Sequence, residues 1–316
     1  MTKTLLWLKI IWAALSSRSN QAFYDKISAF YDDVYVEHEV HARKIIDTLN
    51  EIYKDNKNKT LVLDLGCGTG MMTALLTQAG FKAIGIDISL SSLCVHQENY
   101  PEHLLVQADA NFLPIDDGIF DSVVCLGVWR HFADLNKVLN EVSRVLKDDG
   151  TFIVGYFPPA MAGSIDLNQK WWGRLSIRTY HFLTRVLGYV DRADFTLEKE
   201  TLEIARKKFK SISRVKSDSN KYILLAKHPL KDTKSTRSQE VPLVALDQVL
   251  RCPFCMSNGE SSGKIKPTKD HWLVCQEPGC NRKYPKLENI PVLLNEEGEK
   301  WMRISENDLP ITPSKP

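Results

Sequence analysis

The sequence predicts an α/β fold with a mostly parallel sheet, followed by a small cysteine-rich domain. Three observations support this prediction. Short apolar runs alternate with segments of helical periodicity between about residues 60 and 155. The first apolar run ends in a loop with glycine at every second position, namely Gly66, Gly68 and Gly70. Four of the seven cysteines follow residue 250, where they form two closely spaced pairs.

Each element has a local signal. The run 62–65 is an apolar strand, and 71–79 is a helix that stops at Gly80, a residue suited to the position after a helix. The periodicity of 136–146 predicts another helix, and Asp149–Gly150 predicts a turn. Further apolar runs predict strands at 82–87, 103–110, 120–126 and 151–156.

The glycine-rich loop predicts a cofactor cradle at the start of a helix. Glycine permits the positive φ values of a sharp turn and removes the Cβ atoms that would keep a ligand away from the backbone. A dinucleotide-binding loop has the pattern G-x-G-x-x-G, and Met71 stands where the third glycine of that pattern is expected. The spacing therefore disfavours a nicotinamide cofactor.

Together with Asp64, the three glycines form D-x-G-x-G-x-G, which closely resembles motif I of the class I S-adenosylmethionine (SAM) methyltransferases. The resemblance covers about residues 20–228 of the sequence. It implies a Rossmann-like domain with a mostly parallel seven-stranded sheet, in which Asp64, Gly66, Gly68 and Gly70 bind SAM. The length of 316 residues leaves material for a second domain.

Further candidate cofactor residues follow the next strands. Asp87 ends the second strand, where a carboxylate can accept both ribose hydroxyls of the cofactor. By resemblance to the family, Asp109 and the backbone of Ala110 contact the adenine, and Leu126 completes the cofactor site at the end of the fourth strand. The alternative is that such acids only cap the next helix, as Asp87 before Ser89 would.

The loop after the fourth strand contains the candidate substrate and catalytic residues. Trp129 and Arg130 replace the residues more usual in the family, and we expect them on the substrate side. His131 is a candidate base or substrate ligand, with a structural histidine as the alternative. Tyr31 belongs to a segment that resembles the N-terminal helix folded over SAM in this family, so we expect it near the methionine end of SAM or packed in the core.

The chemistry of the acceptor is suggested by the same loop. It resembles the loop of ubiquinone- and menaquinone-pathway methyltransferases, and it lacks the N-P-P-Y-like motif of enzymes that methylate planar nitrogens. Both features favour a small-molecule or lipid-like acceptor. Residues 158–195 are the candidate substrate lid, in which a basic helix face predicts an anionic group on the acceptor, although a solvated surface helix is the alternative. That face consists of Arg174, Arg178, His181 and Arg185.

Residues 1–19 are predicted to form an apolar N-terminal helix. Lys9 is the single charge between Thr4 and Leu15, and a helix of that length reaches about 18 Å, short of a hydrocarbon core of about 30 Å. We expect either an interfacial anchor or a helix docked on the protein itself. Because Lys9 interrupts the run, a signal peptide is disfavoured, and the sequence predicts a cytoplasmic protein with peripheral membrane contact as an open alternative.

The four late cysteines form one C-x2-C and one C-x4-C pair, which is typical of four thiolates that bind one zinc ion. They are Cys252, Cys255, Cys275 and Cys280. Two disulfides are the alternative, but the three other cysteines and the lack of a convincing export signal favour zinc. The region 242–316 is short for an independent core, so we expect it to need the metal.

This region also resembles a known family. Leu250–Cys255, Tyr284–Pro285 and Glu288–Leu294 are similar to the small zinc-ribbon protein that activates several eukaryotic tRNA, rRNA and release-factor methyltransferases, and to its bacterial relatives. The resemblance implies a zinc ribbon joined to the methyltransferase domain by a solvated linker, residues 229–241. We expect the ribbon to pack against the catalytic domain and stabilise it, with an RNA platform as the alternative.

The sequence therefore predicts a SAM-dependent methyltransferase with a zinc ribbon. The net charge of +2 does not indicate a nucleic-acid-binding protein. Two other functions remain as alternatives: an RNA-modifying methyltransferase that uses the ribbon to bind RNA, and a SAM-binding regulatory protein without turnover. The oligomeric state and the acceptor atom are not predicted.

Overall fold

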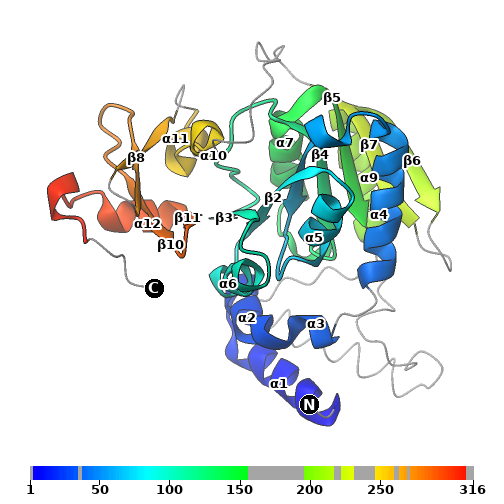
Figure 1. Ribbon diagram of the computed structural model, residues 1–316, viewed down its shortest axis with the longest axis horizontal. Helices are drawn as coiled ribbons and strands as arrows, with labels where there is room; N and C mark the ends of the chain where they lie inside the picture. The colour runs from blue at the N-terminus through cyan, green and yellow to red at the C-terminus, as the bar shows by residue number, and fades with distance from the viewer. Residues whose placement is uncertain are drawn as a thin grey trace.

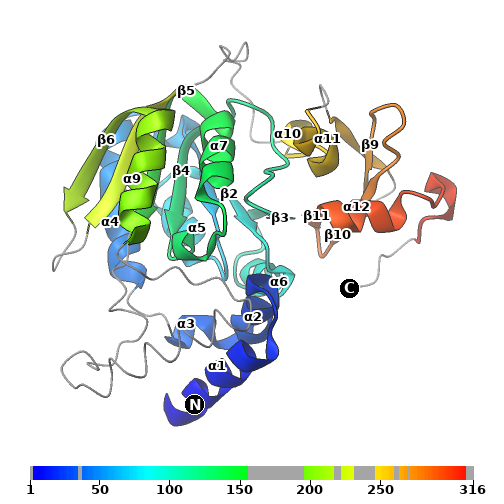
Figure 2. The ribbon, with the colours of Figure 1, turned by 180° about the vertical axis from the view of Figure 1, so that it is seen from behind.

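The computed structural model describes residues 3–34, 38–155, 196–216, 222–230, 246–259, 263–268 and 271–310. Helices lie on both faces of a central sheet (Figures 1 and 2). The strands are β1 (Leu61–Leu65), β2 (Lys82–Asp87), β3 (Leu104–Ala108), β4 (Phe120–Leu126), β5 (Leu146–Gly155), β6 (Phe209–Lys216), β7 (Tyr222–Pro229), β8 (Ile265–Thr268), β9 (Trp272–Cys275), β10 (Lys283–Leu287) and β11 (Ile290–Leu293).

The described helices alternate with these strands in the first half of the chain. The α-helices are α1 (Lys3–Ser16), α2 (Asn20–Ile27), α3 (Tyr31–Val34), α4 (His38–Tyr53), α5 (Met71–Gln78), α6 (Leu90–Asn99), α7 (Leu135–Val145), α9 (Thr196–Lys208), α10 (Leu246–Val249), α11 (Pro253–Ser257) and α12 (Asn295–Trp301). Short 3-10 helices are η1 (Ser28–Phe30), η2 (Lys57–Lys59), η3 (Trp129–His131) and η6 (Glu306–Asp308). No helix among the described residues is long and apolar enough to cross a bilayer.

The strand order of the sheet is β6-β7-β5-β4-β1-β2-β3-β11-β10-β9-β8. Strands β5, β4, β1, β2, β3 and β11 run parallel to one another, while β7 runs antiparallel to both of its neighbours, β5 and β6. The mostly parallel sheet between helices agrees with the expected Rossmann-like fold, and the described sheet has 11 strands. The C-terminal strands continue the same sheet, because β11 pairs with β3.

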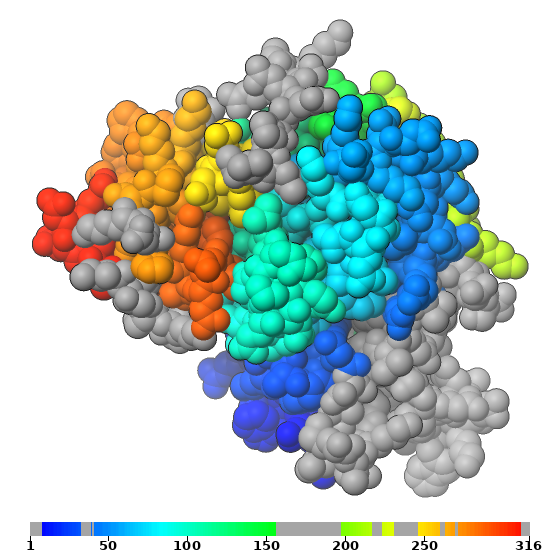
Figure 3. Space-filling view, in the orientation of Figure 1, coloured from blue at the N-terminus to red at the C-terminus, as the bar shows by residue number. Residues whose placement is uncertain are grey.

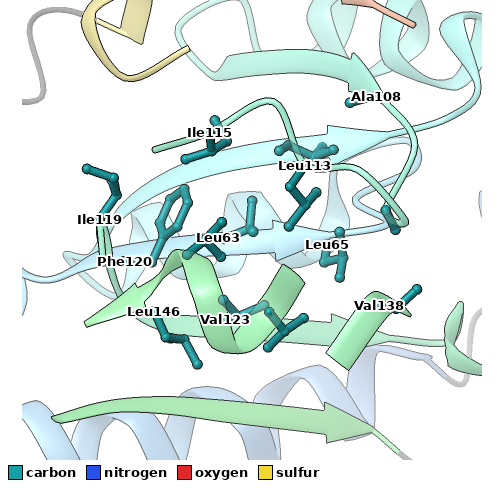
Figure 4. Packing of buried hydrophobic residues seen from close by; sticks show 14 of the residues in the cluster. Leu63, Leu65, Ala108, Leu113, Ile115, Ile119, Phe120, Val123, Val138 and Leu146 are labelled. Carbon is teal, nitrogen blue, oxygen red and sulfur yellow. The ribbon is translucent and has the colours of Figure 1, made fainter. Parts of the chain in front are cut away.

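Two apolar layers cover the sheet. Leu63, Val123 and Phe152 pack with buried residues of α7 and α9 on one face, as Figure 4 shows in part. Val62 and Val124 pack with α4 and α5 on the other face. This alternation along β1 and β4 follows from the opposite directions of successive side chains in a strand.

Helix α7 illustrates how the sequence produces one of these layers. Asp134 caps its start by accepting a hydrogen bond from the Lys137 backbone N–H at 3.0 Å. Leu135, Val138, Leu139 and Val142 are buried at helical spacing, so the helix presents one apolar stripe to the sheet. The predicted turn at Asp149–Gly150 instead lies within β5, at an irregularity where Phe120 pairs with Leu146 but Ser122 pairs with Thr151.

The C-terminal strands attach to the edge of the sheet at two places. Strand β11 pairs with β3, with Val292 opposite Gln107 and Leu293 opposite Ala108. A second contact joins the segment before the cysteines to the loop after β3, because the Arg251 N–H donates to Pro114 O at 2.8 Å and the Arg251 guanidinium pairs with Asp116. The yellow-to-red C-terminal residues accordingly adjoin the cyan-to-green surface in the space-filling view (Figure 3).

Candidate cofactor pocket and cysteine centre

A pocket of about 430 Å³ lies at the carboxyl ends of β1, β2, β3 and β4. In open α/β sheets, ligands bind at this end of the strands, where the strand order changes direction, and the volume falls within the range of small-molecule sites. The residues from the sheet that line it include Gly66, Gly68, Asp87, Asp109, Ala110 and Leu126. The pocket therefore brings together six of the eight predicted cofactor residues, whose contacts with SAM stay predictions.

The three glycines of the loop have different surroundings. All three have positive φ values, of 79° for Gly66, 52° for Gly68 and 104° for Gly70. A Cβ on Gly66 would lie 2.3 Å from Val128 Cγ1, and one on Gly70 would lie 2.5 Å from His96 Cδ2, so these two glycines allow the loop to pack on its neighbours. A Cβ on Gly68 would meet no atom within 4 Å and Gly68 lines the pocket, so its open side faces ligand space.

Asp87 is held at the pocket wall by the backbone. Its Oδ2 accepts a hydrogen bond from the Gly68 N–H at 2.9 Å, and its Oδ1 accepts one from the Ser89 N–H at 2.8 Å. Burial raises the pKa of Asp87 above its usual value. Since each carboxylate oxygen can accept a second hydrogen bond, the side chain is fixed in orientation and keeps acceptor capacity for two hydroxyls.

The next strand end carries Asp109 and Asn111. Asp109 Oδ1 accepts hydrogen bonds from the backbone N–H of Asn111 at 2.9 Å and from its side-chain Nδ2 at 2.8 Å. Both residues line the pocket, and Asn111 Oδ1 is buried without a hydrogen-bond partner in the described part of the chain. A ligand with an amino group would satisfy this oxygen, which fits the adenine predicted here.

Asp64 lies beneath the loop and does not line the pocket, in contrast to its predicted place in the cofactor site. Its side chain is buried, and its Oδ2 accepts a hydrogen bond from Thr73 Oγ1 at 2.6 Å. Burial raises the pKa of Asp64 to about 7. The carboxyl group therefore connects β1 to α5 and supports the loop from below.

The N-terminal segment closes one side of the pocket. The Asn20 amide donates to His131 O at 2.8 Å, and Thr69 Oγ1 donates to Asp32 Oδ1 at 2.6 Å. Tyr24 and Tyr31 line the pocket, and so does His131. The Tyr24 hydroxyl lies 2.7 Å from His131 Nε2, which places a polar pair at the wall.

Tyr24 was not singled out from the sequence, since its partner is 107 residues away and no local pattern indicates the contact.

The structure also corrects the expectation for Trp129. Its side chain is 2% exposed, its indole N–H donates to Thr201 Oγ1 at 2.9 Å, and it packs on Phe152. Trp129 is thus a core residue, whose ring is enclosed between β5 and α9.

Arg130 is half-buried and is not among the residues that line the pocket. The predicted lid, residues 158–195, lies outside the described residues. So do its candidate substrate residues Arg174, Arg178, His181 and Arg185.

The four late cysteines converge at one point. Their sulfur atoms all lie within 4.8 Å of one another, and all four residues are buried. Cys252 Sγ lies 3.8 Å from Cys280 Sγ, and Cys255 Sγ lies 3.7 Å from Cys275 Sγ, so neither pair is disulfide-bonded. A tetrahedral zinc with Zn–S bonds of about 2.3 Å has S–S edges of about 3.8 Å, which these distances match.

Polar groups next to the cysteines favour thiolates. The Tyr284 hydroxyl lies 3.1 Å from Cys252 Sγ, and the Arg282 guanidinium donates to Cys280 Sγ at 3.6 Å. Hydrogen bonding by Cys275, and to a smaller extent by Tyr284, lowers the pKa of Cys252, whereas burial raises the pKa of Cys255. Donors that hydrogen-bond to the ligands of a metal site orient those ligands and reduce their charge.

The cysteine centre is linked to the pocket through α12. Gly298 of α12 packs on the Tyr284 ring, where a Cβ would lie 2.6 Å from Tyr284 Cε1. Two residues earlier, Glu296 lines the pocket. No local sequence pattern indicates this contact, because it arises only when β11 pairs with β3.

Comparison with known proteins supports the fold and its class. A family model described as a methyltransferase domain matches residues 63–154. An uncharacterized protein of Methanocaldococcus jannaschii is 36% identical over 42% of this chain and 49% of its own length. The demethylmenaquinone methyltransferase of Thermus thermophilus is 35% identical over 34% of this chain and 51% of its own length.

Among solved structures, the magnesium protoporphyrin IX methyltransferase of Synechocystis with bound SAH matches with a TM-score of 0.45 and 21% identity, over 62% of this chain and 85% of that one. The chain spans about half the length of the curated relatives given above. The pocket lies at the strand ends of the region, residues 63–154, that matches the methyltransferase domain model.

Proposed function

We propose that this protein transfers a methyl group from SAM to a small-molecule or lipid-like acceptor in the strand-end pocket, and that its four cysteines bind a structural zinc ion. The observation that carries the proposal is the convergence of Gly68, Asp87 and Asp109 on one pocket. The relative from Thermus thermophilus, named for methylation of demethylmenaquinone, supports an acceptor of this class.

The roles of the pocket residues follow from their geometry. Asp87, fixed by two backbone N–H groups, accepts the ribose hydroxyls, and Asp109 with Asn111 accepts from the adenine amino group. Gly68 leaves room for the cofactor next to the backbone. Together these contacts fix the position of the bound cofactor at the end of the sheet.

When bound, SAM supplies an electrophilic methyl group on its sulfonium sulfur. The residues of the chain then have to place a nucleophile in line with that group and exclude water. Tyr24 and His131 are placed for this task, since their 2.7 Å contact forms a polar pair at the wall that can accept a proton from an acceptor hydroxyl as its oxygen attacks. Tyr31 packs against Tyr24, with ring centroids 6.0 Å apart, and narrows the same side of the pocket.

The zinc proposal rests on the sulfur geometry and on the charges next to it. The S–S separations fit a tetrahedral ion, and Arg282 partly offsets the negative charge of four thiolates. The ion would have no open position for substrate, so its role is structural.

The experiment is incubation of the purified protein with methyl-labelled SAM and separated lipid, RNA, protein and small-metabolite fractions. We expect label in the lipid or small-metabolite fraction, and none with the Asp87→Ala variant. Label in RNA alone would replace the proposed acceptor with the RNA alternative. Absence of label from every fraction, with SAM binding intact, would favour a regulatory SAM-binding protein.

A further inference from the structure

Helix α1 has two apolar faces, of which one is packed and the other is exposed. Ile10, Ala13 and Ala14 are buried against Phe23 and Ile27, the buried residues of α2. Figures 1 and 2 show α1 at one end of the molecule, with α2 between it and the sheet. The inward face of α1 therefore docks on the protein, which is one of the two arrangements expected from the sequence.

The outward face is formed by four large apolar side chains at helical spacing. Leu8 is 58% exposed, Ile11 47%, Trp12 62% and Leu15 53%. Where side chains are described, the exposed large apolar residues are these four and Leu230. A helix that is apolar on all sides is normally covered on all sides, so the outer face of α1 indicates a partner.

The charges near α1 identify the kind of partner. The first acidic residue of the chain is Asp25, and the residues before it include three basic ones, Lys3, Lys9 and Arg18. Lys26 holds the end of α1 by donating to Ser16 O at 2.7 Å, and its Nζ lies 5.2 Å from the centre of the Trp12 ring. An apolar stripe accompanied by basic residues, on a segment without an acidic residue before Asp25, complements an interface of acyl chains and anionic headgroups.

The size of the face argues against a second copy of the chain as the partner. Half-exposed side chains of this size leave on the order of 100 Å² each in contact with water, or roughly 400 Å² for the four. A stable dimer buries about 800 Å² on each partner. A helix of 14 residues is about 21 Å long, so α1 is too short to cross a hydrocarbon core of about 30 Å.

We propose that the outer face of α1, formed by Leu8, Ile11, Trp12 and Leu15, binds the surface of a lipid bilayer that contains anionic headgroups. The residues directly after α1 extend to the pocket, since Arg18, Asn20 and Tyr24 line it. A bilayer bound at α1 therefore lies beside one wall of the pocket. The inference that the methyl acceptor lies in the membrane rests on the proposed function, whereas the inference that α1 binds lipid does not.

The test is co-sedimentation of the full-length protein with vesicles of phosphatidylcholine alone or with added phosphatidylglycerol, in the absence of SAM. We expect binding to the anionic vesicles that weakens with salt, and at least a tenfold loss of binding for Leu8→Gln combined with Trp12→Gln. Glutamine preserves helix propensity, and the exposed positions leave the docked face intact. Leu230→Gln is the matched control, because it removes an exposed leucine elsewhere and should bind as wild type.

Failure of the wild-type protein to sediment with either vesicle would overturn the proposal, and so would wild-type binding by the double variant. Light scattering that shows a wild-type dimer and a monomeric double variant would assign the face to a second copy instead. The labelled-SAM assay in solution reads out the proposed function separately, since Leu8 and Trp12 do not line the pocket.

Discussion

The cofactor pocket and the cysteine centre lie on one sheet, but different groups hold them together. In the pocket, backbone N–H groups of Gly68 and Ser89 fix the Asp87 carboxylate above a large apolar core. In the cysteine centre, four buried sulfur atoms from α11, the end of β9 and the turn before β10 face one another. We therefore expect the pocket to be organised before its ligand binds. The C-terminal region, in contrast, should depend on a cation that keeps its sulfur atoms together.

The largest effect should follow loss of the metal. We expect about one zinc per chain, released by Cys280→Ser, with loss of hydrogen-exchange protection in β8, β9 and β10, because a structural zinc contributes on the order of 10 kcal/mol to folding. Elemental analysis and hydrogen exchange measure the two results. Cys94→Ser, in α6, serves as the control and should retain the metal.

Two outcomes would contradict the expectation that the C-terminal region, unlike the pocket, depends on a metal ion. One is the absence of metal together with disulfides among the four cysteines, found by mass spectrometry. The other is unchanged exchange protection in the Cys280→Ser protein. Either result would mean that the C-terminal region does not need a cation.

A smaller effect is expected in the pocket when ligand space is filled. Gly68→Val should lower SAM affinity at least a hundredfold, because the branched side chain occupies the space next to the loop. Gly80→Val is the matched control: Gly80 also has a positive φ, of 92°, and an open Cβ direction, but it does not line the pocket. Calorimetric titration should therefore separate the two variants, and equal affinities would mean that Gly68 does not face the cofactor.

The smallest effect concerns Asp64 and depends on pH. Its pKa is raised to about 7 in the folded protein, so between about pH 4 and 7 the folded state keeps a proton that the unfolded state has lost. The free energy of unfolding should therefore fall as pH rises through this window. Asp64→Asn removes this titrating group. The decrease in the free energy of unfolding from pH 5 to pH 8 should therefore be smaller in the variant than in the wild type, by at least about 1.4 kcal/mol, which corresponds to a shift of one pKa unit.

Urea unfolding at the two pH values measures this difference. Asp55→Asn, at an exposed acid, provides the control and should follow the wild-type pH dependence. A pH dependence of Asp64→Asn equal to that of the wild type would show that Asp64 is not protonated in the folded protein.

The sequence predicted the parts of the molecule that depend on local patterns. The strand ends at Asp87 and Asp109 and the open position at Gly68 are local, since each follows an apolar run or belongs to a short motif. Trp129 was expected in contact with substrate, but its partner Thr201 comes from a helix 72 residues later. The pairing of β11 with β3 and the place of Glu296 at the pocket are equally non-local, and no periodicity in either segment indicates them.

The most direct test of the account is calorimetric titration of SAM into the wild-type protein and into Asp87→Ala. We expect one site per chain for the wild type and at least a tenfold loss of affinity for the variant, with thermal unfolding of the unliganded variant showing that the fold is retained. Asp55→Ala should bind as wild type. No binding to the wild type, or equal affinity for Asp87→Ala, would contradict the assignment of the strand-end pocket to SAM.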